Sequence, residues 1–497
     1  MEYYFLKMQL IISNNMSKNS NKINEKCAVF GIWDGKDASR CAYFGLFALQ
    51  HRGQEQTGIA STDGKKIFSY KHSGLVTQVY TEKIIKGLKG FAAIGHNRYS
   101  TSRGTGSKHA QPIVVNNKFA FAHNGNLPST KALEVFLKKN KISIKNNSDS
   151  ELMAKAIGFY MKKGISLSKA VEASYPLFTG AFSCVVLSKN ELVAFRDPRG
   201  IRPLVMGKND KEVVIASETC GLRTVGAHFF REILPGELIT ISKKGIESKI
   251  LAKEDPKFDI FEFVYFSRHD CIMLGQSVYQ VRKNFGEILF KENPKLKLDI
   301  IVPVPETAIP GAIGYSHTSG VPLEIALNKN RYIHRTFIEP TQKSREEKIK
   351  MKLTVLRSIV TGKKVGVIDD SIVRGNTSKE IVKMFFDAGA KEVHFLVCSA
   401  PVKFPDFYGI DTPKQEKLIA SQKTVKEICE YIGATSLSYL SIDGMVKATS
   451  LPKDRFCLSA FNGEYPLPIF EHEKEINYDS LKFSVQDGSA SGGKVNH

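Results

Sequence analysis

A cysteine marks the point where this sequence changes character. Residues 25–33 read EKCAVFGIW, so Cys27 follows a polar, Asn- and Lys-rich segment and precedes an apolar run typical of a buried strand. A thiol is a nucleophile only as thiolate, and its ordinary pKa of about 8.5 means that it needs a base. A single cysteine is most often a small buried hydrophobic residue. Other stretches of the sequence must therefore decide between these interpretations.

A second stretch, VGVIDDSIVRGNT at 365–377, has the features of a phosphate-binding loop. Residues 365–368 predict a buried parallel strand, 378–388 a helix that ends at Gly389, and 393–398 the next strand. Thr377 and Glu380 have the spacing of a capping box at the helix start. The loop then lies between the carboxyl end of a strand and the N-terminus of a helix, where free N–H groups favour phosphate.

Individual residues of this loop suit a sugar phosphate. Gly375 permits close approach of the backbone to an anion. Asp369 and Asp370 could accept hydrogen bonds from sugar hydroxyls or face Mg²⁺, which prefers carboxylates together with substrate phosphates. Two adjacent aspartates alone would more often be an ordinary acidic turn, so the prediction rests on the whole string.

The length and composition indicate two large domains. The chain has 497 residues, with 42% hydrophobic and 24% charged residues, which is ordinary for a globular protein but too long for one core. Interleaved short strands and helices, including helices over 40–50 and 150–162, fill the first half up to a polar joint at 252–258. The α/β pattern beyond the joint is clearer, with LDIIVPVP, VPLEIAL, KKVGVIDD and KEVHFLVCSA as its apolar runs, and the chain ends in a Gly/Ser tail.

The cysteines and the hydropathy of the chain indicate the kind of cellular compartment in which the protein is expected. The eight cysteines form no CxxC pair, which favours free thiols in a reducing compartment over a disulfide framework. No apolar run reaches 18 residues, so a membrane span is not expected, and the start MEYYFLKMQLII lacks the features of a secretory signal. Either Met1 or Met16 could be the start of translation.

The net charge of +21 leaves two interpretations open besides solvated lysines: binding of nucleic acid, or binding of a polyanionic substrate. Residues 329–357 hold nine basic residues against three acidic ones, and this segment precedes the phosphate motif. That location favours a polyphosphate substrate over DNA.

Three stretches resemble the class II, N-terminal-nucleophile glutamine amidotransferases: LQHRGQEQTGIA (49–60), IGHNRYST (94–101) and AHNGNL (122–127). The resemblance implies a four-layer αββα glutaminase domain in which Cys27 is the nucleophile. It assigns Asn124 and Gly125 to the oxyanion hole, and it assigns glutamine binding to Arg98, Thr101 and Asp149. Arg52 is expected to brace the Cys27 end of the domain.

In this family the cysteine is residue one of the mature chain. A free α-amine, with a pKa of about 7.7–8.0, can act as the base at neutral pH, whereas the amide nitrogen of an internal Cys27 cannot. We therefore expect residues 1–26 to be a leader that is removed, leaving a glutaminase domain over 27–255.

The loop at 365–377 resembles the signature of type I phosphoribosyltransferases, which bind phosphoribosyl pyrophosphate (PRPP). The resemblance implies a Rossmann-like parallel sheet over 256–470, followed by a tail over 471–497 whose end is expected to be disordered. The PRPP-binding residues that it implies are Asp369, Asp370, Ser371, Arg374, Gly375, Asn376, Thr377, Lys329 and Tyr332. Thr307, Asp369 and Asp370 are the expected Mg²⁺ site. Asn376 and His334 depart from the family pattern, which has Thr and Gly there.

Together the two halves resemble the amidophosphoribosyltransferase family, whose members transfer glutamine-derived ammonia to PRPP in the committed step of purine synthesis. The resemblance implies a cytoplasmic enzyme, a homotetramer or homodimer that purine nucleotides of the AMP/GMP class inhibit, without nucleic-acid or membrane partners. Some members hold an iron–sulfur cluster on four cysteines. Here Asp259, Asp406 and Ala460 stand at three of those positions and only Cys457 remains, so no cluster is expected.

Two rival functions are weaker. Another class II amidotransferase, such as glucosamine-6-phosphate synthase, would have no use for a PRPP loop. A DNA-binding regulator with a phosphoribosyltransferase-like domain would need neither the glutaminase motifs nor their spacing, and no helix-turn-helix pattern precedes Cys27.

Overall fold

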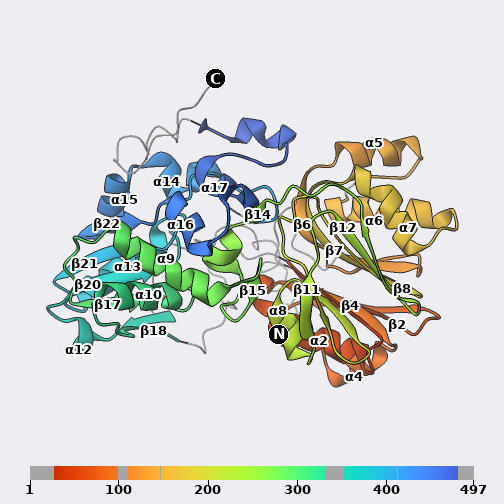
Figure 1. Ribbon diagram of the computed structural model, residues 1–497, viewed down its shortest axis with the longest axis horizontal. Coiled ribbons are helices and arrows are strands. Elements are labelled where there is room, and N and C mark those ends of the chain that lie inside the picture. The colour runs from red at the N-terminus through yellow and green to blue at the C-terminus, as the bar shows by residue number, and fades with distance from the viewer. Residues whose placement is uncertain are drawn as a thin grey trace, which may run out of the picture.

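The computed structural model describes residues 27–98, 110–145, 147–330, 352–410, 412 and 414–478. These residues form two lobes that lie side by side (Figure 1). The first lobe comprises the strands up to β13 (Gly245–Ile250), and the second begins near β14 (Phe258–Asp259). The polar joint expected at 252–258 therefore lies between them.

The first lobe contains two antiparallel sheets. Strand β1 (Ala28–Trp33) lies in the middle of a seven-stranded sheet, where β10 and β4 pair with it on either side. The order of this sheet is β11 (His228–Glu232), β9 (Val205–Lys208), β10 (Val213–Ala216), β1, β4 (Ala92–Arg98), β2 (Gln56–Thr62) and β3 (Ile67–Ser73). All six residues of β1 are buried, which explains the unbroken apolar run after Cys27.

The second sheet of this lobe has six strands. Its order is β13, β12 (Glu237–Ser242), β8 (Glu191–Arg196), β7 (Thr179–Ser188), β6 (Phe119–Ser129) and β5 (Ile113–Val115). One apolar cluster, which includes Val29, Ile94, Ala122 and Val185, joins the two sheets face to face.

Helices cover the outer face of each sheet, so the lobe has the four layers, αββα, that the resemblance to the glutamine amidotransferases implies (Figure 1). Helices α2 (Ala38–Ala48), α3 (Val76–Val79), α4 (Glu82–Gly87) and α8 (Thr219–Thr224) pack on the first sheet. Helices α5 (Lys131–Lys139), α6 (Asp149–Lys162) and α7 (Leu167–Ser174) pack on the second. The predicted helices at 40–50 and 150–162 correspond to α2 and α6. Ser148 and Glu151 form a capping box that fixes the start of α6.

The second lobe is built on a four-stranded parallel sheet. Its order is β17 (Ile300–Pro303), β20 (Lys364–Asp369), β21 (Glu392–Val397) and β22 (Ser436–Tyr439). Residues such as Ile301 and Ile368 face α9 (Val278–Glu292), α10 (Ile309–Ser319) and α16 (Ile442–Thr449). Val302 and Val367 face the opposite cluster with α13 (Asn376–Asp387) and α15 (Val425–Ile432). Helices on both faces of a parallel sheet make this the expected Rossmann-like arrangement.

Two expectations for this lobe need correction. The run VPLEIAL is not a sheet strand: only an isolated bridge joins Leu323 to Ile301, and β18 (Leu327–Lys329) begins at its last residue and pairs with β19 (Leu353–Val355). The predicted capping box is wrong, because Gly375, at φ 77°, precedes the helix and α13 already begins at Asn376. The start expected for the tail contains a 3-10 helix, Phe470–Glu475, and residues 479–497 lie outside the described part.

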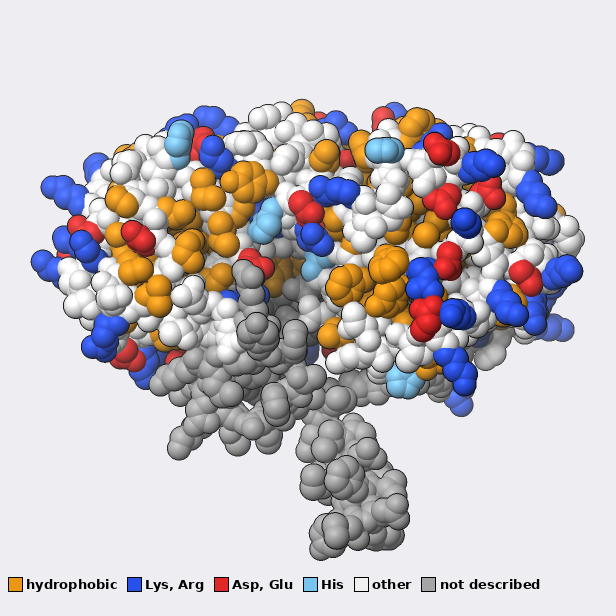
Figure 2. All heavy atoms as spheres, turned by 90° about the horizontal axis from the view of Figure 1, so that it is seen from below, with side chains coloured by type: hydrophobic (Ala, Val, Ile, Leu, Met, Phe, Trp, Pro, Cys, Tyr) orange, Lys and Arg blue, Asp and Glu red, His pale blue; other side chains and the backbone are white. Residues whose placement is uncertain are grey.

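The surface of the described residues is mixed in character. On the face drawn in Figure 2, Lys and Arg side chains alternate with acidic ones around hydrophobic areas on both lobes. None of the described helices combines the length and apolar character needed to cross a membrane.

Candidate active sites

The strand that follows Cys27 places this residue beside a buried arginine. Cys27 is half-buried and directly precedes β1. Its backbone carbonyl accepts a hydrogen bond of 3.4 Å from Nε of Arg52. Arg52 lies in a 3-10 turn after α2 and is 1% exposed. This contact agrees with the expectation that Arg52 braces the Cys27 end.

Asn124 and Gly125 lie in the middle of β6, on the sheet opposite β1. A hydrogen bond of 3.0 Å joins His96 Nε2 on β4 to the carbonyl of His123, and His96 is paired with Val29 on β1. The Cys27 end of β1 and the HNGN segment are thereby held together across the two sheets. Burial lowers the pKa of His96 to about 3, so the imidazole is neutral in this contact.

The side chain of Asn124 has an unusual position. It is fully buried, yet neither atom of its carboxamide has a hydrogen-bond partner among the described residues. Buried polar atoms are nearly always paired, and an exception commonly marks a ligand or functional position. At Gly125, whose φ is 147°, a Cβ atom would stand 2.0 Å from the carbonyl oxygen of Ala181, so only glycine fits.

Arg98 and Asp149, two of the residues expected to hold glutamine, lie at the same end. Strands β1 and β4 are antiparallel, and Ala28 on β1 pairs with Asn97 on β4. Cys27, which precedes Ala28, therefore lies opposite Arg98, which follows Asn97. Arg98 Nη1 is 3.4 Å from Gln56 Oε1. Asp149, the first residue of α6, accepts a hydrogen bond of 3.2 Å from Leu127 N–H, just after the HNGN segment. Thr101 lies outside the described residues.

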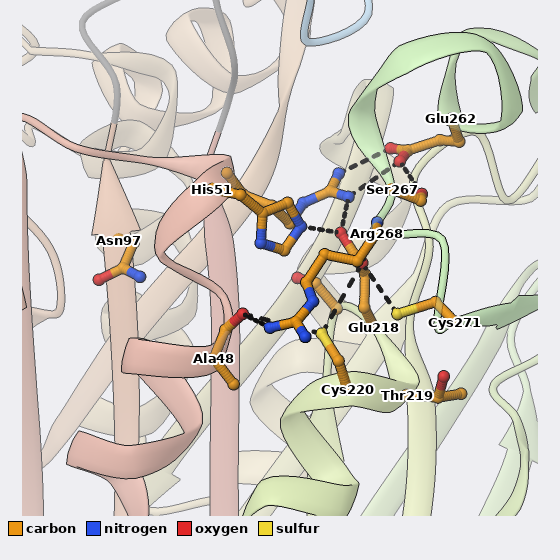
Figure 3. A network of polar contacts seen from close by, with 12 residues as sticks. Ala48, His51, Asn97, Glu218, Thr219, Cys220, Glu262, Ser267, Arg268 and Cys271 are labelled. Carbon is orange, nitrogen blue, oxygen red and sulfur yellow. Dashed lines mark hydrogen bonds and ion pairs between the residues drawn. The ribbon is translucent and has the colours of Figure 1, made fainter. Parts of the chain in front are cut away.

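A buried network of arginines and carboxyl groups extends from Arg52 into the second lobe, and Figure 3 shows its part around His51, Glu218 and Glu262. Arg52 pairs with Glu218 at 2.5 Å and with Glu262 at 2.6 Å, and Arg202 pairs with Glu262 at 2.6 Å and with Asp259 at 3.0 Å. His51 Nε2 is 2.7 Å from the same oxygen of Glu218. Although burial opposes this, His51 and Arg52 hold the pKa of Glu218 below its usual range, and Arg52 and Arg202 do the same for Glu262.

Sequence reasoning missed Glu218, Glu262 and Arg202. Two of them could have been found, because Glu218 and Glu262 are charged residues within the otherwise buried segments ASETCG and IFEFVYF. A charge in a buried segment needs a partner of opposite charge. The partners are distant in sequence, 166 and 210 residues in the case of Arg52, and no local pattern reveals them.

A second candidate site lies at the carboxyl ends of β17 and β20. The Thr307 hydroxyl donates a hydrogen bond to Asp370 Oδ2, and Ser371 Oγ donates to Asp370 Oδ1 at 2.7 Å. Asp369 accepts a hydrogen bond of 2.9 Å from the N–H of Asp370, and both carboxylates are buried. The sequence motifs around 307 and 370 are thus brought together at one edge of the parallel sheet.

The loop from Arg374 to Thr377 leads into α13 from this edge. Gly375 has φ 77°, and a Cβ there would meet Ile419 at 2.8 Å. Asn376 Oδ1 accepts a hydrogen bond of 2.6 Å from the Tyr431 hydroxyl. Lys329 is exposed at the end of β18, which pairs with β19. Tyr332 and His334 lie outside the described residues.

Asp259, Asp406 and Cys457, three of the four positions expected to correspond to cluster cysteines, lie near one another where the lobes join. Asp259 and Cys457 are register partners in a short parallel pair, β14 with β23 (Phe456–Cys457), and the Ala460 carbonyl accepts from Lys403 N–H at 2.9 Å. Burial, followed by the nearby Asp406 carboxylate, raises the pKa of Asp259 to about 8. Two carboxylates, one thiol and a methyl group do not fit an iron–sulfur cluster, which is held by thiolates.

Comparison with known proteins supports both halves of this description. Residues 96–224 match the family model of a glutamine amidotransferase domain. The amidophosphoribosyltransferase of Synechococcus elongatus is 44% identical over 90% of this chain and 93% of its own length. That of Bacillus subtilis is 40% identical over 90% of this chain and 96% of its own.

Solved structures agree with this relationship. A structure of the allosteric regulatory enzyme of purine biosynthesis superposes with a TM-score of 0.84 at 41% identity, covering 89% of this chain and 97% of the other. The structure of glutamine PRPP amidotransferase from B. subtilis, complexed with ADP and GMP, superposes with a TM-score of 0.83 at 40% identity. The match covers 89% of this chain and 98% of the other.

The fold and the two sites define a class II glutamine amidotransferase joined to a phosphoribosyltransferase. The αββα lobe carries the cysteine and the unpaired Asn124, and the parallel sheet carries the acidic loop. The chain belongs to the amidophosphoribosyltransferase family. It is therefore a pentosyltransferase of purine biosynthesis.

Proposed function

We propose that this chain releases ammonia from glutamine at Cys27 and transfers it to PRPP at the Asp369–Thr377 loop, giving 5-phosphoribosylamine, glutamate and pyrophosphate. The Cys27 thiolate attacks the glutamine carboxamide carbon, and the oxyanion forms hydrogen bonds with the Asn124 amide and the Gly125 N–H. Ammonia leaves, and water hydrolyses the γ-glutamyl thioester. The observation that carries this half is the buried Asn124 carboxamide, which has no partner among the described residues.

Substrate glutamine would be held by its charged ends. The Arg98 guanidinium suits the α-carboxylate, because its planar fork matches a carboxylate bidentately. Asp149 suits the α-ammonium group, and the Thr101 hydroxyl would add a further hydrogen bond. Support for Asp149 comes from its position beside Leu127, immediately after the oxyanion segment.

The active chain would begin at Cys27, whose α-amine then serves as the base for its own thiol. Residues 1–26 would be removed as a propeptide. Intact-mass measurement of the purified, active protein tests this directly. A mass that corresponds to residues 27–497 is expected, whereas full activity in a chain that keeps its leader would overturn the proposal.

In the second site the loop N–H groups and the start of α13 would bind the 5-phosphate of PRPP, together with Ser371, Arg374, Gly375 and Thr377. Asp369 and Asp370 would accept hydrogen bonds from the ribose hydroxyls. Asn376 Oδ1 is occupied by Tyr431, so its carboxamide nitrogen is the group left to donate to phosphate. Lys329 and Tyr332 would contact PRPP from the segment that follows β18.

The donor set at this edge also suits Mg²⁺, since Thr307, Asp369 and Asp370 offer one hydroxyl and two carboxylates, the hard oxygen ligands that the ion prefers. When bound with PRPP, Mg²⁺ would neutralise charge on the leaving pyrophosphate. Ammonia would then attack the anomeric carbon of the ribose. It would travel inside the protein, because in bulk water it would be protonated.

We further propose purine nucleotides as inhibitors, a homotetramer or homodimer, and a cytoplasmic location. A relative complexed with ADP and GMP supports nucleotide binding, and eight free cysteines among the described residues support a reducing compartment. Glutamine-dependent release of pyrophosphate from PRPP tests the central activity. A mature protein that releases none but binds DNA would instead be the regulator considered above.

A further inference from the structure

Two thiols and a carboxylate gather in the interior at a place that the proposed reaction does not use (Figure 3). Glu218 precedes α8, Cys220 lies in α8, and Cys271 belongs to the segment that enters the second lobe. Their ligand atoms all lie within 4.8 Å of one another. Cys271 Sγ is 3.1 Å and Cys220 Sγ is 3.8 Å from the same oxygen, Glu218 Oε2.

The two carboxylate oxygens of Glu218 have different neighbours. Oε1 faces Arg52 and His51, at 2.5 and 2.7 Å. Oε2 faces the two thiols and accepts the backbone N–H of Arg268 at 3.1 Å. The charge pairing of Glu218 with Arg52 can therefore persist while Oε2 binds a different group.

The spacing matches metal coordination better than a covalent bond. Around a tetrahedral zinc ion, with Zn–S of about 2.3 Å and Zn–O of about 2.0–2.2 Å, adjacent ligand atoms lie roughly 3.5–3.8 Å apart. Of the two sulfur–oxygen distances, 3.8 Å lies at the upper end of that range and 3.1 Å is shorter, so small shifts of the side chains would place both atoms around one ion. A disulfide would require the sulfur atoms to approach to about 2 Å and would leave Glu218 without a role.

The charge balance of a buried site also favours a divalent ion. Both thiols are almost fully buried, at 2% and 1% exposure. One divalent cation that forms two metal–sulfur bonds displaces two thiol protons to the solvent, so the net charge of the interior does not change. Thiolate ligands select soft cations such as zinc over magnesium or calcium.

We propose that Glu218, Cys220 and Cys271 form a binding site for one thiophilic divalent cation of the zinc class, with the fourth position open to water. The partly exposed side chain of Arg268 lies beside the site, because its guanidinium and Cys220 Sγ both contact the Ala48 carbonyl. The site joins α8 to the segment of the second lobe, next to the hydrogen bond of 3.1 Å between Ile272 N–H and Thr219. Cation binding therefore stabilises the junction between the lobes.

The test uses Cd²⁺ as the probe, because cadmium thiolates absorb in the ultraviolet. The full-length chain with Cys27→Ala removes the one cysteine that the reaction uses. Titration is expected to give one Cd²⁺ per chain with the absorbance of two thiolates, and a large excess of Zn²⁺ should compete for the same site. Cys220→Ser and Cys271→Ser, each added separately, should weaken binding by more than about tenfold, the smallest loss typical even of outer-shell partners of a metal site.

A matched control is Cys429→Ser, which replaces a half-buried thiol in α15 and should leave the titration unchanged. Unaltered Cd²⁺ absorbance in both junction variants would overturn the proposal. So would a disulfide between Cys220 and Cys271 in peptide maps made without reductant.

If a serine variant does not fold, the unmodified chain provides a second measurement. Bound Cd²⁺ should slow alkylation of Cys220 and Cys271 in mild denaturant by at least about tenfold relative to Cys429, as read by mass spectrometry of the peptides. Equal alkylation with and without Cd²⁺ would again overturn the proposal.

Discussion

The side chain of Asn126 donates a hydrogen bond of 2.8 Å to the backbone carbonyl of Phe407, across 281 residues of sequence. Asn126 follows Gly125 on β6, whereas Phe407 belongs to a loop of the second lobe. Asp406 fixes that loop by accepting hydrogen bonds from Tyr408 N–H at 2.9 Å and Ile410 N–H at 2.7 Å. The second lobe therefore forms part of the wall behind the proposed oxyanion hole.

The same loop predicts the effect of Gly409→Ala. Gly409 has φ 125°, and a Cβ there would stand 3.2 Å from the Cα of Gly125. The combined strain and contact should displace Gly125 N–H, and loss of one oxyanion donor typically costs about 10²–10³ in rate. Partial displacement should lower glutamine-dependent turnover by about tenfold or more, measured as glutamate release. Ammonia-dependent synthesis should change little.

Gly433→Ala is the control for this variant, because Gly433 also has a positive φ, 74°, but no atom within 4 Å of the added Cβ. It should cost some stability and leave both activities intact. Equal loss of glutamine- and ammonia-dependent synthesis in the Gly409 variant would indicate a general folding defect instead of a displaced oxyanion hole.

Replacement of Cys27 by alanine should separate the two reactions. The variant has no nucleophile, so glutamine-dependent synthesis should fall to background, whereas ammonia supplied in solution can still reach PRPP. Both activities are measured as pyrophosphate release. Cys41→Ser, in α2, is a suitable comparison because its half-buried thiol has no assigned role. Parallel loss of both activities would contradict the two-site scheme.

Asp370→Asn should weaken the phosphoribosyl reaction. The Asp370 carboxylate accepts hydrogen bonds from Thr307 and Ser371 and faces the proposed ribose and Mg²⁺ site. Hydrogen bonds to charged groups contribute about 1.5–3 kcal/mol, so kcat/KM for PRPP should fall roughly 10- to 100-fold. Labelling of Cys27 by a reactive glutamine analogue should persist. Unchanged PRPP kinetics would rule out the assignment of Asp370.

Local sequence predicts the elements of this protein well where apolar periodicity and turn residues agree. The buried run after Cys27 and the strand–loop–helix unit around Asp369 are examples, because one segment contains all the information that each needs. The predicted start of the helix, at residue 378, was wrong, because α13 begins at Asn376. Gly375, in the left-handed conformation, precedes the helix without a capping side chain.

Pairings between distant segments could not be predicted in this way. Arg52 meets Glu262, and Asn126 meets Phe407, only after both lobes have folded. A buried charge shows that it needs a partner but not which one. The motifs could therefore suggest candidate residues for each site, but they could not predict the contacts of the junction between the lobes. Those contacts are known only from the structure.

The junction also predicts how stability depends on pH. Burial and the Asp406 carboxylate raise the pKa of Asp259 to about 8, and Arg202 opposes this shift without cancelling it; Glu262 adds to it. An unfolded aspartate has a pKa of about 3.9. Between these values the folded chain keeps a proton that the unfolded chain has released, so the free energy of unfolding falls as pH rises, by up to about 1.4 kcal/mol per pH unit.

Asp259→Asn cannot release this proton, and its apparent melting temperature should therefore decline less between pH 6 and 8 than that of the unsubstituted chain. Asp443→Asn, at a carboxylate that is 68% exposed, is the matched control and should keep the original slope. Thermal unfolding at several pH values within this interval measures both. An identical slope in all three proteins would mean that Asp259 is already ionised at pH 6, with Arg202 as the dominant influence on its carboxylate.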